Sequence, residues 1–171
     1  MFCFPFVCQG KKTAPLAQRG EKLYTQFSLF VLKHTHLTTN YRKGILVPIN
    51  TEVEFISANK SVIEVRIPEY NLDVRIQNVE GFSGEKIDGI FARTLGREKV
   101  DLTNFTEVEQ KSIKQGVAAV GMTKDATIKA LGYPPHHRTP SLNLNEWRYW
   151  HNKFNTFLVV FDEGKVSGIK Q

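Results

Sequence analysis

The hydrophobic pattern of this chain changes its period near residue 100, and this change limits the folds open to it. Up to about Val79, short runs alternate apolar and polar residues, as in "TEVEFI", which is typical of strands with one buried face. From about Thr103, apolar residues recur at roughly helical spacing before strand-like runs return. The sequence therefore predicts an α+β protein with a leader at 1–22, a β-rich domain at 23–100 and a second domain at 101–171.

The β-rich domain consists of short strand-like runs separated by turn residues. In "SVIEVRI", for example, Val65 and Ile67 alternate with Glu64 and Arg66. The runs lie at 22–35, 44–50, 51–57, 61–67 and 72–79. This spacing predicts a small antiparallel barrel or sandwich, SH3-like in size, followed by a short helix that ends at Gly96.

The second domain begins with two helices whose ends are marked by capping residues. Thr106 and Glu109 fit a capping box, and Gly116 weakens or ends the first helix. Thr123 caps the second helix, and Gly132 is expected to end it in the left-handed conformation. The apolar stripe of the first helix is predicted to be Phe105, Val108, Ile113 and Val117.

Three strands are predicted after the helices. Trp147 and Tyr149 alternate with Arg148 and Trp150, and we expect the first pair to face the helices. A buried strand follows at 156–161, then a type I turn with a bulge at 162–164 and a final strand. The predicted architecture is a two-layer ααβββ domain.

This order of elements resembles the SmpA/OmlA family of small outer-membrane lipoproteins, which includes a subunit of the β-barrel assembly machine. The similarity covers roughly 103–169, and no family is recognised for the N-terminal half. The residues that carry it are Gly121, Met122, Thr123, Leu131, Gly132, Pro134, Trp147, Tyr149, Val160, Phe161, Asp162, Gly164 and Val166. The resemblance implies a non-enzymatic protein-binding module of the cell envelope that supports outer-membrane assembly or integrity. A similar unit occurs in β-lactamase-inhibitory proteins, so an inhibitor-like module is the alternative.

Composition and the N-terminus bear on compartment. The 41% hydrophobic and 23% charged residues describe a folded protein, and the net charge of +6 permits an anionic partner. Cys3 and Cys8 are the two cysteines, which excludes a disulfide-stapled fold. The apolar start is interpreted either as a leader or as an export remnant with Cys8 as the lipidation site. We expect the cell envelope, or the cytoplasm if Met1 is the true start and remains unprocessed.

No catalytic or cofactor motif is found in the sequence. The histidines show no zinc-ligand spacing, and Asp162 fits a turn better than an acid catalyst. We therefore expect no enzyme, no cofactor, no metal site and no small-molecule substrate. A nucleic-acid-binding role is the weaker alternative, because no RNP-like signature accompanies the basic charge.

Another envelope protein is the partner that we expect. An exposed tryptophan beside cations is typical of a binding surface. The candidate contacts are Arg148, Trp150, His151, Lys153, His136 and His137. The alternative for Trp150 is cover by the N-terminal domain. The loop at 38–44, with Tyr41 and Arg42, is interpreted as a turn rim, with partner contact as its alternative.

Overall fold

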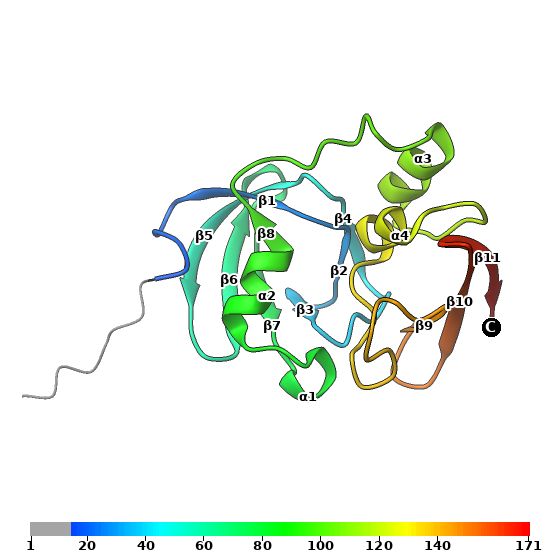
Figure 1. Ribbon diagram of the computed structural model, residues 1–171. Helices are drawn as coiled ribbons and strands as arrows, with labels where there is room; N and C mark the ends of the chain where they lie inside the picture. Colours follow the sequence, from blue (N-terminus) through cyan, green and yellow to red (C-terminus); the bar gives the residue numbers. More distant parts are fainter. Residues whose placement is uncertain (1–14) are drawn as a thin grey trace, which may run out of the picture.

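The computed structural model describes residues 15–171, and Figure 1 shows a curled sheet on one side and a smaller sheet with two helices on the other. The α+β class is confirmed. Cys3, Cys8 and most of the predicted leader lie outside the described residues. The elements are β1 (Lys22–Thr25), β2 (Leu29–Val31), β3 (Thr35–Leu37), β4 (Ile45–Val47), β5 (Glu52–Ala58), β6 (Val62–Ile67), the 3₁₀ helix η1 (Pro68–Tyr70), β7 (Leu72–Gln77), α1 (Glu80–Ser83), α2 (Ile87–Thr94), β8 (Leu95–Gly96), α3 (Glu107–Gln115), α4 (Lys124–Leu131), β9 (Glu146–Trp150), β10 (Thr156–Asp162) and β11 (Lys165–Lys170).

The first half, residues 15–100, is built on a six-stranded sheet in the order β3-β7-β6-β5-β1-β8. The sheet curls into a half-barrel with β3 and β8 at its two edges (Figure 1). The prediction of an antiparallel sheet is wrong for one pair, because β3 runs parallel to β7. Lys33 and His34 both adopt positive φ between β2 and β3, and this sharp turn brings β3 to the free side of β7.

The core of the first half lies between the sheet and α2. Phe91 of α2 meets Phe55 of β5 edge to face, with ring centroids 6.1 Å apart. Burying an aromatic side chain of this size stabilises the fold by about 2–3 kcal/mol. The helix ends at Thr94 rather than Gly96, because Leu95 and Gly96 form β8 and pair with β1. Ala17 is also buried in this core, so part of the predicted leader packs against the sheet.

The second half, residues 101–171, places α3 and α4 against the sheet β11-β10-β9 (Figure 1). Trp147 and Tyr149 are fully buried under the helices, as predicted. The Tyr149 hydroxyl donates to the carbonyl of Gly132 at 2.9 Å, which satisfies its one buried polar atom. The predicted order of two helices and three strands is therefore present.

The buried face of α3 differs from the predicted stripe. The helix spans only Glu107–Gln115, so Phe105 and Val117 flank it, and Val108 is 58% exposed. Ile113 is buried as predicted, and Glu109 and Ser112 share its face in place of Val108. Glu109 lies on the buried face because its carboxylate also caps the second helix.

Glu109 caps both helices of the second half. Its Oε2 accepts the backbone N–H of Thr106 at 3.0 Å, which completes the predicted capping box on α3. Its Oε1 accepts the backbone N–H and the hydroxyl of Thr123, both at 2.8 Å, at the start of α4. One carboxylate therefore ties the two helix N-termini together, where the helix dipoles favour negative charge.

Two predicted turns adopt other conformations. Gly132 has φ 75° and ψ −175°, so it ends α4 in extended backbone with positive φ, not in the left-handed helical region. Glu163 and Gly164 both have positive φ and join β10 to β11 as a two-residue turn, which is typical of type I′. The register of this hairpin shifts between Val160 and Phe161, where Ser167 is the extra residue, so the bulge lies in β11 and not at the turn.

Candidate functional site

The two halves meet along the segment 38–44, which the sequence analysis interpreted as a turn rim. That interpretation is wrong for Thr38, Thr39 and Asn40, which are buried. Asn40 Nδ2 donates to the carbonyls of Leu131 and Tyr133, at 2.7 and 3.0 Å. Leu131 is the last residue of α4 and Tyr133 lies just beyond it, where helix carbonyls lack partners within the helix, so the amide caps α4 from the other half. We call the contact between segment 38–44 and the second half the junction.

Arg42 makes the second set of bonds across the junction. Its guanidinium donates to the carbonyl of Leu131 at 3.0 Å and to the carbonyl of Gly116. Burial lowers the pKa of Arg42 to about 10, so the group remains charged at neutral pH. The guanidinium also lies over the Phe30 ring, 4.6 Å from its centroid. A charge that points at two helix C-termini interacts favourably with both dipoles.

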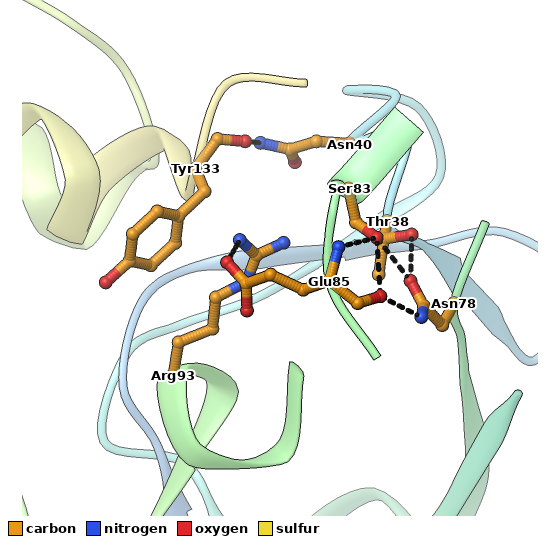
Figure 2. A network of polar contacts seen from close by, with 7 residues as sticks. All are labelled: Thr38, Asn40, Asn78, Ser83, Glu85, Arg93 and Tyr133. Carbon is orange, nitrogen blue, oxygen red and sulfur yellow. Dashed lines mark hydrogen bonds and ion pairs between the residues drawn. The ribbon is translucent and has the colours of Figure 1, made fainter. Parts of the chain in front are cut away.

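A polar network lies beside the junction and holds α1 to the sheet (Figure 2). Thr38 and Ser83 donate to Asn78 Oδ1 at 3.2 and 2.7 Å, and Asn78 Nδ2 donates to the Glu85 carbonyl at 2.7 Å. All three side chains are buried, so these bonds replace the water that each group loses on folding. The network therefore fixes the position of segment 38–40 from the side of the first half.

Arg93 joins this network to the second half. Its Nη1 is 2.7 Å from Glu85 Oε1, and its guanidinium lies 4.6 Å from the centre of the Tyr133 ring, as Figure 2 shows. A small cavity of about 10 Å³ lies here, which suits one water molecule. It is lined by Phe27, His36, Thr38, Asn40, Arg93, Thr94 and Tyr133.

His36 is the buried titratable group of this cavity. Its Nδ1 lies 3.0 Å from the carbonyl of Phe30 and, in the neutral ring, donates to it. Burial lowers the pKa of His36 to about 4, and the charges of Arg93 and Arg42 act in the same direction. The ring is therefore neutral at physiological pH. The cavity that this ring lines has room for about one water molecule.

A larger, apolar pocket opens on the other side of segment 38–44. Its volume is about 110 Å³, and both halves contribute to its walls. The lining residues are Phe30, Leu32, Thr35, Leu37, Tyr41, Lys43 and Asn152. We call this the junction pocket, and it is the candidate functional site.

We define the rim of the junction pocket by five exposed apolar or basic residues, each of which lines it or lies within two positions of a lining residue, namely Leu32, Lys33, Lys43, Lys153 and Phe154. Leu32 is 44% exposed although it lines the pocket. Phe154 is 79% exposed and lies in the β9–β10 turn, whose conformation Asn152 sets by accepting the N–H groups of Phe154 and Asn155. Lys153 Nζ lies over the Phe154 ring at 4.7 Å. This composition is typical of a surface that binds another macromolecule.

Trp150, His137 and His136 lie toward the first half. The Trp150 carbonyl accepts the N–H of Arg42 at 3.1 Å, and Trp150 forms a parallel bridge with Tyr41. The His137 ring lies 5.2 Å from the Trp150 ring and 4.3 Å from that of Phe82 in α1. The N–H of His136 donates to the Phe82 carbonyl at 2.7 Å. The backbone of Trp150 therefore contacts the first half, while its ring lies beside His137 of its own half.

The other predicted contact residues have separate surroundings. Arg148 Nη1 donates to Thr156 Oγ1 at 3.0 Å on the neighbouring strand. The His151 ring lies 4.6 Å from the Phe157 ring, while Lys153 belongs to the rim of the junction pocket. Of the six predicted contact residues, Lys153 alone belongs to the rim, and Tyr41, for which partner contact was the alternative, lines the pocket. The other wall residues were not predicted from the sequence.

Two structural searches cover residues 15–171 only. No group of three or more His, Cys, Asp or Glu side chains in this range is arranged to hold a metal ion. None of the helices in the same range has the length and apolar character needed to cross a membrane.

No protein family, curated protein or solved structure matches this chain significantly.

Proposed function

We propose that the protein is a non-enzymatic binding module that holds a segment of another protein in the junction pocket. The observation that carries this proposal is the pocket itself, an apolar hollow whose walls come from both halves and whose rim exposes Leu32 and Phe154. Apolar side chains left in water at such a rim are stabilised when a partner covers them.

The size of the pocket favours a protein side chain over a free small molecule. Pockets that enclose drug-sized ligands have volumes of roughly 300–1,000 Å³. The junction pocket, at about 110 Å³, is also smaller than the roughly 150 Å³ cavity that holds benzene in an engineered protein. One aliphatic side chain fits this volume, with the affinity completed by contacts around the rim.

The resemblance of residues 103–169 to the SmpA/OmlA family supports placing this module in the cell envelope. The capped helix pair, the three-stranded sheet and the inward Trp147 and Tyr149 agree with that resemblance. On this proposal the partner is an envelope protein and the role is in outer-membrane assembly or integrity. The SH3-like character of the first half belongs to the same proposal, supported by its curled sheet of short strands.

Site-specific crosslinking tests the proposal. A photoreactive benzoylphenylalanine in place of Phe154 is expected to capture a specific partner in cells, and the same group at Tyr70, an exposed residue of η1, is not. The purified partner should then bind the protein. Leu32→Asp should weaken this binding at least tenfold. Ile169→Asp is the matched control, because Ile169 is 43% exposed and Leu32 is 44% exposed.

Two results would contradict a protein-binding role of the junction pocket. One is equal crosslinking from both photoreactive positions. The other is an equal loss of affinity in the Leu32→Asp and Ile169→Asp variants. That result would mean that a charge at any exposed apolar position weakens partner binding.

A further inference from the structure

The excess positive charge of the chain is concentrated in two segments. Residues 29–51 and 126–161 together contain seven Lys and Arg residues and one acidic residue, Glu146, which is a net charge of +6. The rest of the chain contains the other 16 basic and 16 acidic residues and is therefore neutral. The basic residues are Lys33, Arg42, Lys43, Lys129, Arg138, Arg148 and Lys153. The whole net charge of the protein thus lies in these two segments.

The two segments are distant in sequence but meet at the junction. Asn40 and Arg42 of the first segment bind the carbonyl of Leu131 in the second, and Tyr41 pairs with Trp150. The junction pocket is lined by residues of these two segments alone. Folding therefore joins two acid-poor stretches around a single apolar pocket.

Three lysines of these segments are free to bind an anion at the pocket rim. Lys43 lines the pocket, Lys33 follows Leu32, and Lys153 follows Asn152. All three are exposed, and none takes part in the ion pairs found within residues 15–171. Outside the two segments, by contrast, Lys22, Arg66, Arg75, Arg93 and Arg97 are each paired with a carboxylate.

We infer that the segment bound in the junction pocket is acidic, with one aliphatic side chain in the pocket and Asp or Glu residues beside it. This inference rests on the proposed protein-binding function and names the chemistry of its partner. Carboxylates on both sides of the aliphatic residue would lie near Lys33, Lys43 and Lys153, and complementary charge raises both association rate and specificity. Nucleic acid fits less well, because a hollow of about 110 Å³ holds one side chain rather than a row of stacked bases.

Three matched peptides test this inference on the full chain. Each has a central leucine, with two flanking residues on either side that are all Asp or Glu, all Asn or Gln, or all Lys. Binding is followed by chemical-shift changes of the isotope-labelled protein. The acidic peptide is expected to shift the amides of Leu32, Lys43 and Asn152 and to bind at least tenfold more tightly than the lysine peptide. Its affinity should fall several-fold between low and high salt, because exposed charges are screened.

Charge-reversal variants separate local charge from total charge. Lys43→Glu and Lys153→Glu should each weaken binding of the acidic peptide by about three- to tenfold. Lys111→Glu is the control, because Lys111 is an exposed residue of α3 outside both segments and its reversal changes the total charge equally. An equal effect of all three variants would overturn the inference.

The remaining outcomes distinguish this inference from the proposed function. If the neutral peptide binds as tightly as the acidic one at the same amides, the acidic partner is excluded and the protein-binding pocket stands. A second outcome leads to the same conclusion. In it no peptide binds, but crosslinking at Phe154 still captures a partner that Leu32→Asp releases. If a single-stranded oligothymidylate shifts these amides at lower concentration than the acidic peptide, both the acidic segment and the protein partner are excluded.

Discussion

Arg42 joins parts of the chain that are far apart in sequence. It donates to the carbonyl of Gly116, 74 residues away, and to that of Leu131, 89 residues away. These carbonyls belong to the ends of α3 and α4, where helices leave backbone acceptors without internal partners. The sequence "TTNYRKG" predicts a polar surface loop. Its polarity does not show whether the arginine binds water or the carbonyls at the ends of helices.

Replacing Arg42 with alanine should destabilise the protein. The variant leaves the Gly116 carbonyl without its donor, whereas the Leu131 carbonyl keeps the bond from Asn40. The loss of one buried donor costs about 1–3 kcal/mol, and we expect the free energy of unfolding in urea to fall by about this amount. The exposed neighbour provides the control, since Lys43→Ala should change stability by less than about 0.5 kcal/mol. Similar effects of the two substitutions would show that Arg42 does not hold the junction.

His36 should make the protein sensitive to mild acid. Its pKa is about 4 in the folded state, because of burial, and 6.5 in the unfolded chain. The unfolded state therefore takes up a proton first as the pH falls, so the contribution of neutral His36 is complete above pH 6.5 and is lost toward pH 4. The loss amounts to about 3 kcal/mol. Urea unfolding at pH 7 and at pH 4.5 should show a smaller loss for His36→Gln than for the native chain. Equal losses would contradict a buried neutral His36.

At the scale of elements, the helix caps show how local signals and distant contacts combine. Thr106 and Thr123 cap their helices as the sequence predicts, but both share the carboxylate of Glu109. Burial tends to raise the pKa of Glu109, but hydrogen bonds from Thr123 and Thr106 outweigh it and hold the pKa below its usual value. The capping box of α3 is local, whereas its extension to α4 needs the two helices to be adjacent.

Two features favour glycine at position 132, its backbone conformation and the nearby Phe27 ring, and a comparison with Gly164 tests them. Its φ is positive, and a Cβ there would lie 2.8 Å from the ring of Phe27. Gly164 also has positive φ, but a Cβ there would meet nothing within 4 Å. Gly164→Ala should cost about 1–2 kcal/mol from backbone strain alone. Gly132→Ala should cost at least about 2 kcal/mol more in urea unfolding, because its extended backbone with positive φ is less favourable for a side chain and overpacking against Phe27 adds to that strain. Equal costs would mean that neither effect operates at position 132.

At the scale of the whole molecule, each core contains a side chain from the other half. Ile49 of the first half is buried in the core under α3 and α4, and Tyr133 of the second half packs on the core of the curled sheet. The rings of Phe27 and Tyr133 meet edge to face at 5.7 Å. The two halves are therefore distinct in architecture but share their packing, and the junction pocket depends on both.

This sharing predicts a single cooperative unfolding transition. Both tryptophans, Trp147 and Trp150, lie in the second half, so their fluorescence reports on that half alone. Amide exchange at Ile63 in β6 reports on the first half. The unfolding midpoint from fluorescence should coincide with that from Ile63, because loss of one half removes part of the other core. Separated midpoints would show that the halves fold as independent domains, with the pocket formed only by their docking.

The sequence by itself determined the local features of this protein. Alternation identified the strands and the inward faces of Trp147 and Tyr149, and capping residues located both helices of the second half. These features follow from side-chain periodicity and from capping preferences, which depend on residues close in sequence and not on tertiary contacts. The acid-poor segments 29–51 and 126–161 can also be found from the distribution of charge in the sequence. The sequence does not indicate that these two segments meet in the fold.

Only the tertiary structure decided which polar residues are buried and where the junction pocket forms. Val108 is exposed while Glu109 is buried, β3 pairs in parallel with β7, and Arg42 binds helix ends in the other half. Each of these depends on a neighbour distant in sequence, and periodicity shows that a face is buried without showing what covers it. The junction pocket exists for the same reason, because its walls come from segments more than a hundred residues apart, Phe30 to Lys43 and Asn152.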